Sequence, residues 1–70
     1  MPNSVYKVIE IVGSSSESWE KAAQVALDKA SKSLRDLRVA EVAALDIHLD
    51  DKGKIAAYRT KLKVSFKFEG

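Results

Sequence analysis

The stretch "LRVAEVAALDIHLDDKGKIAAYRTKLKVSFKF", residues 37–68, decides the fold, because it fills nearly half of the 70-residue chain. On either side of "DDKG", residues 50–53, apolar and polar residues alternate, which is the pattern of two strands joined by a tight turn. Gly53 suits the positive φ that such a turn requires. We therefore predict a hairpin with strands over residues 39–49 and 54–68.

Each strand of this hairpin is predicted to have two different faces. In the second strand the even positions are mostly apolar and should pack on a helix, whereas the odd positions carry cations. The even positions are Ala56, Tyr58, Thr60, Leu62, Val64, Phe66 and Phe68, and the odd ones include Arg59, Lys61, Lys63 and Lys67. In the first strand, strict alternation puts Val39, Ala43, Leu45, Ile47 and Leu49 on one face and Ala40, Val42, Ala44, Asp46 and His48 on the other.

The segment before the hairpin predicts one strand and one helix. "VYKVIEIV", residues 5–12, is rich in β-branched residues and apolar on both sides, so we expect a strand that is covered on both faces. In "GSSSESWEKAAQVALDKASKSLRDL", residues 13–37, apolar residues recur at helical spacing and are mostly alanine. The helix should begin near Ser15 or Ser16. Trp19, in its first turn, is expected to anchor it on the sheet or on a neighbouring subunit.

The element order is therefore β-α-β-β, which indicates an α+β fold in a single domain over residues 1–70. The handedness of crossover connections favours a helix that returns the chain so that the second strand runs parallel to the first. The third strand then lies between them, antiparallel to both. We predict a three-stranded antiparallel sheet of order 2-3-1 wrapped around one helix.

A single helix is too short for a sheet with strands of this length. Strands of about 11 and 14 residues span roughly 35 to 45 Å, whereas a helix of about 20 residues spans roughly 30 Å. The ends of the hairpin should protrude, and an uncovered apolar surface beside an open edge strand normally marks an interface. We therefore expect a closed homo-oligomer.

Composition excludes several classes of function. The chain has no cysteine and one histidine, which excludes disulfides, thiolate metal sites and zinc sites built from several imidazoles. Its net charge of +2 comes from interleaved charges, so we expect no nucleic-acid partner. No apolar run approaches the roughly 20 residues that span a bilayer, so we expect no membrane partner and a cytoplasmic location. His48 and Asp46 lie two residues apart, but no nucleophile accompanies them, so we predict that the protein is not an enzyme.

Four segments carry a family resemblance. They are "VYKVIEIVG" at residues 5–13, "SWEKAAQVALDKAS" at 18–31, "LRVAEV" at 37–42 and "YRTKLKVSFKFE" at 58–69. Together they resemble the dodecins, and the resemblance covers residues 5–69. It implies a hollow homododecamer that binds and stores a flavin, FMN or riboflavin, at sites shared between two subunits, without catalytic turnover.

The resemblance also names candidate cofactor-binding residues, namely Val39, Glu41 and Arg59. The family's "W-F-E-V" appears here as "V-A-E-V", so Val39 stands where a tryptophan would stack on the flavin ring, and Arg59 stands at a glutamine position. A stack of this kind contributes on the order of 1 to 3 kcal/mol. Its loss should weaken flavin binding roughly tenfold to a hundredfold.

The resemblance is also compatible with a second hypothesis about function. Dodecins without the stacking tryptophan exist, and the chain is similar to a branch of them that has been associated with calcium. This branch implies a flavin-free dodecin with a structural or calcium-associated role. Asp46 and Asp50 are the candidate metal ligands, in a site that would have to be shared between subunits, although Asp50 also fits the hairpin turn.

The cations of the second hairpin strand have two alternative roles. They could meet an anionic ligand such as the phosphate of a flavin nucleotide, or they could pair with Glu10, Glu41 or Glu69 between strands or subunits. We favour pairing, because cross-strand charge pairs are common.

Overall fold

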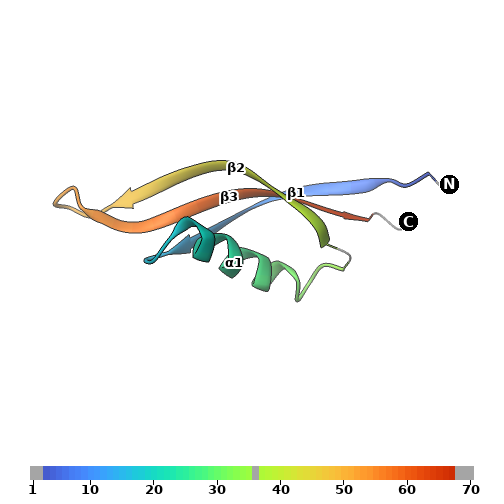
Figure 1. Ribbon diagram of the computed structural model, residues 1–70, viewed down its shortest axis with the longest axis horizontal. Helices are drawn as coiled ribbons and strands as arrows, with labels where there is room; N and C mark the ends of the chain where they lie inside the picture. Colours follow the sequence, from blue (N-terminus) through green and yellow to red (C-terminus); the bar gives the residue numbers. More distant parts are fainter. Residues whose placement is uncertain (1–2, 36, 68–70) are drawn as a thin grey trace.

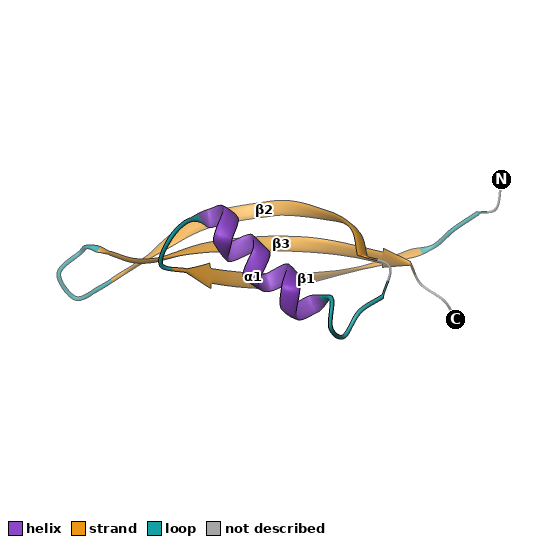
Figure 2. Ribbon diagram, turned by 60° about the horizontal axis from the view of Figure 1, so that its bottom comes forward, coloured by secondary structure: helices purple, strands orange, loops and turns teal. Residues whose placement is uncertain are grey.

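The computed structural model describes residues 3–35 and 37–67 and has the predicted order of elements (Figure 1). They are β1 (Tyr6–Ser15), α1 (Trp19–Ala30), β2 (Leu37–Leu49) and β3 (Ile55–Lys67). The sheet order is β1-β3-β2, with β3 antiparallel to both neighbours, and α1 lies across one face of the sheet (Figure 2). The predicted fold and strand order are confirmed, while Phe68 and Glu69 lie outside the described residues.

The helix begins later and ends earlier than the sequence indicates. Ser14 and Ser15 continue β1, opposite Arg59 and Tyr58, because the ladder with β3 offers their backbone regular hydrogen bonds. The N-cap is Ser18, which has extended φ and ψ and accepts a hydrogen bond from the Lys21 amide at 3.0 Å. The predicted start near Ser15 or Ser16 is wrong by three or four residues, and α1 has 12 residues where about 20 were expected.

Small residues allow α1 to lie very close to β1. Ala22 and Ala26 are the buried residues of the helix, and Gly13 on β1 lies directly beneath them. A β-carbon built on Gly13 would overlap the Ala22 carbonyl oxygen and would lie 2.9 Å from Ala26 Cβ. Under the helix, β3 contributes the fully buried Thr60, Leu62 and Val64, as its even positions predict.

A bulge in β2 overturns the predicted division of its faces. Val42 lies opposite Leu62, but Ala44 lies opposite Lys61, so the register shifts by one residue at Ala43. Directly opposed residues in a sheet share a face, so a one-residue shift exchanges the two faces. Before the bulge, Ala40 and Val42 lie on the helix side and Val39 on the far side. After it, Leu45 and Ile47 lie on the helix side, opposite Thr60 and Tyr58. Val39 therefore does not share a face with Leu45 and Ile47.

The β2–β3 turn forms as the sequence predicts. Gly53 has a φ of 77° and donates its amide to the Asp50 carbonyl at 3.0 Å. The Asp50 side chain accepts from the amides of Lys52 and Lys54, both at 2.9 Å. Asp50 is therefore a turn residue in this structure.

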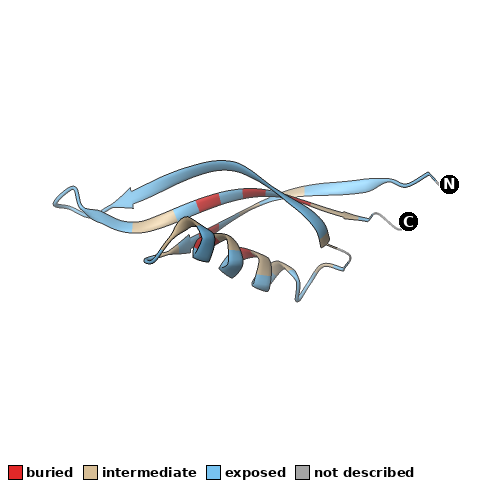
Figure 3. Ribbon diagram, in the orientation of Figure 1, coloured by how far each residue is buried: buried red, intermediate tan, exposed pale blue. Residues whose placement is uncertain are grey.

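The molecule is elongated and thinly covered. Its principal extents are 54 × 20 × 16 Å, whereas a helix of 12 residues spans about 18 Å. Figure 3 shows the buried residues gathered on α1 and on the parts of β1 and β3 beneath it, with most of β2 and the hairpin end exposed. The exposed large apolar residues are Val5, Tyr6, Val8, Val12, Val25, Val39, Val42, Leu45, Ile47, Leu49 and Ile55. The predicted double covering of β1 does not occur among the described residues of one chain, where Val8 and Val12 are both more than half exposed.

Candidate functional site

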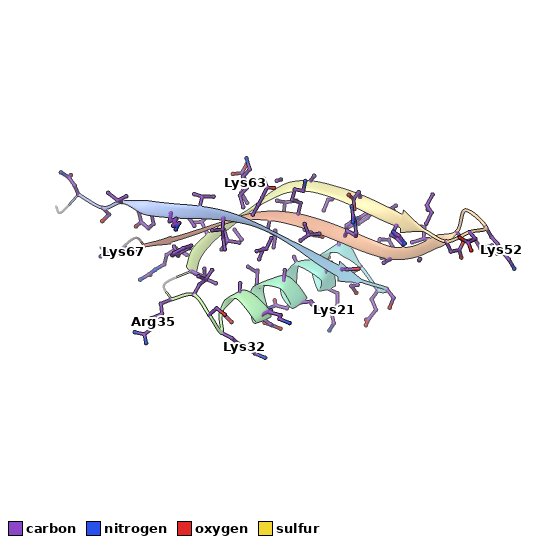
Figure 4. The ribbon with its side chains drawn as sticks, turned by 180° about the vertical axis from the view of Figure 1, so that it is seen from behind. Lys21, Lys32, Arg35, Lys52, Lys63 and Lys67 are labelled. Carbon is purple, nitrogen blue, oxygen red and sulfur yellow. The ribbon has the colours of Figure 1, made fainter. Side chains whose placement is uncertain are left out.

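All three candidate cofactor-binding residues lie on the face of the sheet opposite α1, here called the outer face. The register defines its members. They include Val8, Glu10, Val12 and Ser14 of β1, Val39, Glu41, Ala44, Asp46 and His48 of β2, and Arg59, Lys61, Lys63, Ser65 and Lys67 of β3. Figure 4 shows Lys63 projecting from the side of the sheet away from α1, whereas Lys21 and Lys32 project from the helix side. The outer face is thus charged along β3 and partly apolar along β1.

One chain does not bring the candidate residues together. Val39 lies opposite Ser65 and Arg59 lies opposite Asp46, so the two candidates are separated by six positions of β3. At about 3.3 Å per residue, this separation is about 20 Å. A site that contains both residues at contact distance needs a second copy of the chain.

Arg59 is held by Asp46, which sequence reasoning missed. Arg59 Nε and Nη2 donate to the two carboxylate oxygens of Asp46 at 2.7 and 2.8 Å. The hydrogen bond from Arg59, followed by its charge, lowers the pKa of the Asp46 carboxyl below the ordinary 3.8 and raises that of the Arg59 guanidinium. Both side chains are about half exposed, at 52% and 48%. A simple count from the turn places Asp46 opposite Tyr58, and the register shift between His48 and Leu49 moves it to Arg59.

A second cation of β3, Lys63, lies beside two acids without forming an ion pair with either of them. Lys63 lies between Glu10 of β1 and Glu41 of β2 in the register. Within residues 3–35 and 37–67, Lys63 forms no ion pair with Glu10 or Glu41, so the expected pairing is not formed within the single chain. Glu69, the third expected partner, lies outside the described residues.

The two candidate metal ligands have other partners in this structure. Asp46 is bound by Arg59, and Asp50 closes the hairpin turn. Over the part of the chain that the structure describes, no three acidic or histidine side chains gather closely enough to hold a metal ion. Calcium commonly takes six to eight oxygen ligands. One chain therefore fits calcium only if other copies supply further oxygens.

Trp19 ties the start of α1 to the sheet, as the sequence predicts. Its indole Nε1 donates to the Asp46 carbonyl oxygen at 3.1 Å, and its own carbonyl accepts from Thr60 Oγ1 at 2.8 Å. Its ring meets Tyr58 edge to face, with centroids 5.0 Å apart. These contacts lie on the helix side of the sheet, so Trp19 does not replace the missing aromatic of the outer face.

An apolar groove separates α1 from the open side of β1. Its volume is about 680 Å³, and Ile9, Val12, Val25, Ala30 and Leu34 are among its lining residues. Lys29, Ser14 and Ser33 are the polar residues of its lining. The lining of this groove and the exposed residues of β2 leave a large apolar surface in contact with solvent in the single chain. A surface of this kind normally marks an interface.

Fold and surface together define a small α+β protein. One helix covers part of a long antiparallel sheet, and most charged groups of the sheet lie on the face opposite that helix. Residues 5–69 match the family model for dodecin. The chain belongs to the dodecin family.

Related sequences and structures align with almost the whole chain. A calcium dodecin from Mycobacterium tuberculosis is 55% identical over 64 residues, which cover 91% of this chain and 89% of the relative. The crystal structure of that calcium-chelating antigen, described with a novel calcium-binding site, has a TM-score of 0.84 at 53% identity and covers 94% of this chain and 93% of its own. A dodecin structure from Streptomyces coelicolor has a TM-score of 0.91 at 34% identity, with 100% and 99% coverage.

Membrane-spanning helices are absent from residues 3–35 and 37–67, where the structure contains no helix of sufficient length and apolarity.

Proposed function

We propose that the protein is a non-catalytic, cytoplasmic homododecameric shell that sequesters a small ligand at faces shared between copies. The observation that carries this proposal is the uncovered apolar surface of the hairpin. Leu45, Ile47 and Leu49 are 51%, 39% and 54% exposed in the single chain. Association would bury them, since removing apolar surface from water is favourable by roughly 25 cal/mol per Å².

Calcium is the first candidate ligand. It is supported by the 55% identical relative that bears the name calcium dodecin, and by Val39 in the position of the stacking tryptophan. Asp46 and Asp50 remain the proposed ligands from this chain. Because one chain assembles no acidic cluster among its described residues, this calcium site would combine oxygens from several copies.

Flavin is the second candidate ligand. A specific observation favours it, because Val39, Glu41 and Arg59 all lie on the outer face, where a second copy could complete a site. Arg59 and Glu41 offer polar groups for the edge of a flavin ring. Val39, however, offers no aromatic surface, so this site fits the polar edge of the ring better than its plane.

Native mass spectrometry followed by ligand titration tests the proposal. We expect a twelve-subunit species without added ligand, and calcium binding by isothermal calorimetry at a stoichiometry set by shared sites. Riboflavin fluorescence quenching measures flavin binding on the same preparation. A stable monomer would contradict the shell, and a dodecamer that binds neither ligand would contradict the sequestering role.

A further inference from the structure

The outer face carries its charges in rows that run across the sheet. A row is the set of outer-face residues that oppose one another on β1, β3 and β2, and it takes the name of its β3 residue. From the hairpin end, the Arg59 row holds Ser14, Arg59 and Asp46, the Lys61 row holds Val12, Lys61 and Ala44, the Lys63 row holds Glu10, Lys63 and Glu41, and the Ser65 row holds Val8, Ser65 and Val39. The Lys61 row therefore has one unbalanced positive charge and the Lys63 row one unbalanced negative charge, whereas the other two rows are neutral.

The single chain leaves the charges of the two middle rows unbalanced and exposed. The Lys61 row contains no acid, and Asp46 of the next row is already bound by Arg59. In the Lys63 row one lysine stands between two acids and, among the described residues, forms no ion pair with either. All charged side chains of both rows are exposed. A partner surface that offers a negative row to Lys61 and a positive row to the two acids would neutralise both.

A second copy of the outer face is such a surface. Consider two outer faces that meet about a twofold axis, which lies between them and crosses β3 at Leu62, midway between Lys61 and Lys63. The axis reverses the order of the rows, so the Lys61 row of each copy lies against the Lys63 row of the other. Opposite charges then meet twice in one contact. An axis at Lys61 or Lys63 would instead place one charged row against its own copy.

The same axis brings together the two candidate residues that one chain holds apart. Arg59 lies three positions from Leu62 along β3, and Ser65, the partner of Val39, lies three positions away on the other side. The axis therefore places the Arg59 row of one copy against the Ser65 row of the other, next to Val39. Within one chain these rows are about 20 Å apart. Charge balance and the completion of the shared site thus select the same axis.

We propose that the outer face is a self-complementary interface in which two copies meet about a twofold axis at Leu62, with Lys61 of each copy against the Lys63 row of the other. This inference rests on the proposed function, because it assigns one contact of the proposed shell to a surface and a register. Lys61, Glu10 and Glu41 set this register, since a shift along β3 brings like charges together.

Charge reversal tests the contact. Lys61→Glu makes both middle rows negative, and Glu41→Lys makes both positive, so each variant alone places like charges together twice in every contact. We expect each variant to lose the twelve-subunit species in native mass spectrometry at low salt. Lys52→Glu, in the exposed turn, makes the same change in net charge as Lys61→Glu and should assemble like the wild type.

Co-expression of the two variants separates contact between copies from contact within one chain. A Lys61→Glu chain and a Glu41→Lys chain present opposite charges in both pairs of rows, so together they should restore the twelve-subunit species. With one chain labelled with ¹⁵N, mass spectrometry should find equal numbers of the two chains, because each contact requires one of each. Charges that balanced only within a chain would give no such rescue.

Three results would overturn the inference. A fully assembled Lys61→Glu protein, or co-expressed variants that remain small, would refute this interface while a wild-type dodecamer leaves the proposed function intact. A monomeric wild type would refute both.

Cysteine crosslinking gives a second measurement that does not depend on charge reversal. The chain has no cysteine, so Ser65→Cys and Arg59→Cys each introduce a single thiol. The axis at Leu62 places the Ser65 row of one copy against the Arg59 row of the other, whereas two identical positions are about 20 Å apart. A short bismaleimide reagent should therefore crosslink the two co-expressed variants and neither variant alone. Crosslinks within either variant alone, or none in the mixture, would contradict this axis.

Discussion

Gly13 and Gly53 lack a side chain for different physical reasons. At Gly13 the helix is so close that a β-carbon would overlap the Ala22 carbonyl, although the backbone itself is ordinary. At Gly53 there is open space around the α-carbon, but the φ of 77° disfavours residues with a side chain. The first glycine serves packing, and the second serves the turn.

Substitution of the two glycines should therefore have unequal costs. Gly13→Ala must push α1 away from β1 and should lower the free energy of unfolding by about 3 kcal/mol. Gly53→Ala should cost about 1 kcal/mol, and Gly53→Asn less, because asparagine tolerates a positive φ. Urea denaturation at one fixed protein concentration measures both, and equal costs for the two alanine variants would contradict this account.

Val39 tests the assignment of the flavin site. Val39→Trp should restore an aromatic surface on the outer face and raise flavin affinity roughly tenfold to a hundredfold. Riboflavin fluorescence quenching measures the change. Val42→Trp is the matched control, since Val42 is also an exposed valine of β2 but lies on the helix side. An equal gain in both variants would show that position 39 has no special role.

At the scale of elements, the serine run "SSSES" before α1 offers several caps, and only the strand pairing selects among them. Ser15 belongs to β1 and accepts a hydrogen bond from the Glu17 amide at 3.0 Å, while Ser18 caps the helix. β1 therefore sets where the helix begins.

Replacing the cap should cost more than replacing its neighbour. Ser18→Ala removes the acceptor of the Lys21 amide and should destabilise the fold by about 1 kcal/mol. Ser16→Ala, at an exposed position before the cap, should change stability by less than about 0.5 kcal/mol. Chemical denaturation compares the two, and the reverse order would show that the helix begins at the earlier serine.

The Asp46–Arg59 pair should give the hairpin a dependence on pH. Because pairing lowers the pKa of Asp46 below 3.8 in the folded chain, its stabilising effect is complete above that value and is lost as the pH falls through the lower, folded-state pKa. We expect the melting temperature of wild type to exceed that of Asp46→Asn near neutral pH by a small margin, since exposed pairs contribute little. That margin should shrink below about pH 4, and a margin independent of pH would contradict the pairing.

At the scale of the whole molecule, the chain spreads its apolar residues over more surface than one helix can cover. The exposed positions lie on both sides of the sheet, because the bulge at Ala43 turns Leu45 and Ile47 toward the helix side while Val39 remains on the outer face. Two separate surfaces of one chain are therefore available for neighbours. A chain with two such surfaces can build a closed shell instead of stopping at a dimer.

Charge on the hairpin should disrupt this assembly. Leu45→Glu places a carboxylate where the single chain exposes apolar surface, and burial of that charge in an interface is unfavourable. We expect smaller species in native mass spectrometry and size-exclusion chromatography. Lys52→Glu is the control, because it adds an acid in the exposed turn, away from Leu45 and Ile47. This variant should assemble like the wild type. If the Leu45→Glu protein assembled fully, the surface around Leu45 would not be part of the interface.

The sequence by itself determined the order of elements, the strand order, the hairpin turn and the residues of β3 beneath the helix. The elements, the turn and the buried face of β3 depend on local rules, because alternation, turn chemistry and helical spacing act over a few neighbouring residues. The strand order follows from the handedness of crossover connections, which is common to nearly all folds. Thr60, Leu62 and Val64 are buried as their alternation predicts, and Gly53 has its positive φ. The family resemblance also followed from four segments of the sequence, without any knowledge of the structure.

Only the tertiary structure decided which side of β2 each residue takes, where α1 begins, and that Arg59 is held by Asp46. Each of these depends on pairing between strands distant in sequence. A bulge exchanges the faces of a strand, and the alternation of apolar and polar residues in β2 does not reveal it. A one-residue shift after the turn changes every cross-strand partner. Local patterns determine which elements form, but the register between them determines which side chains meet.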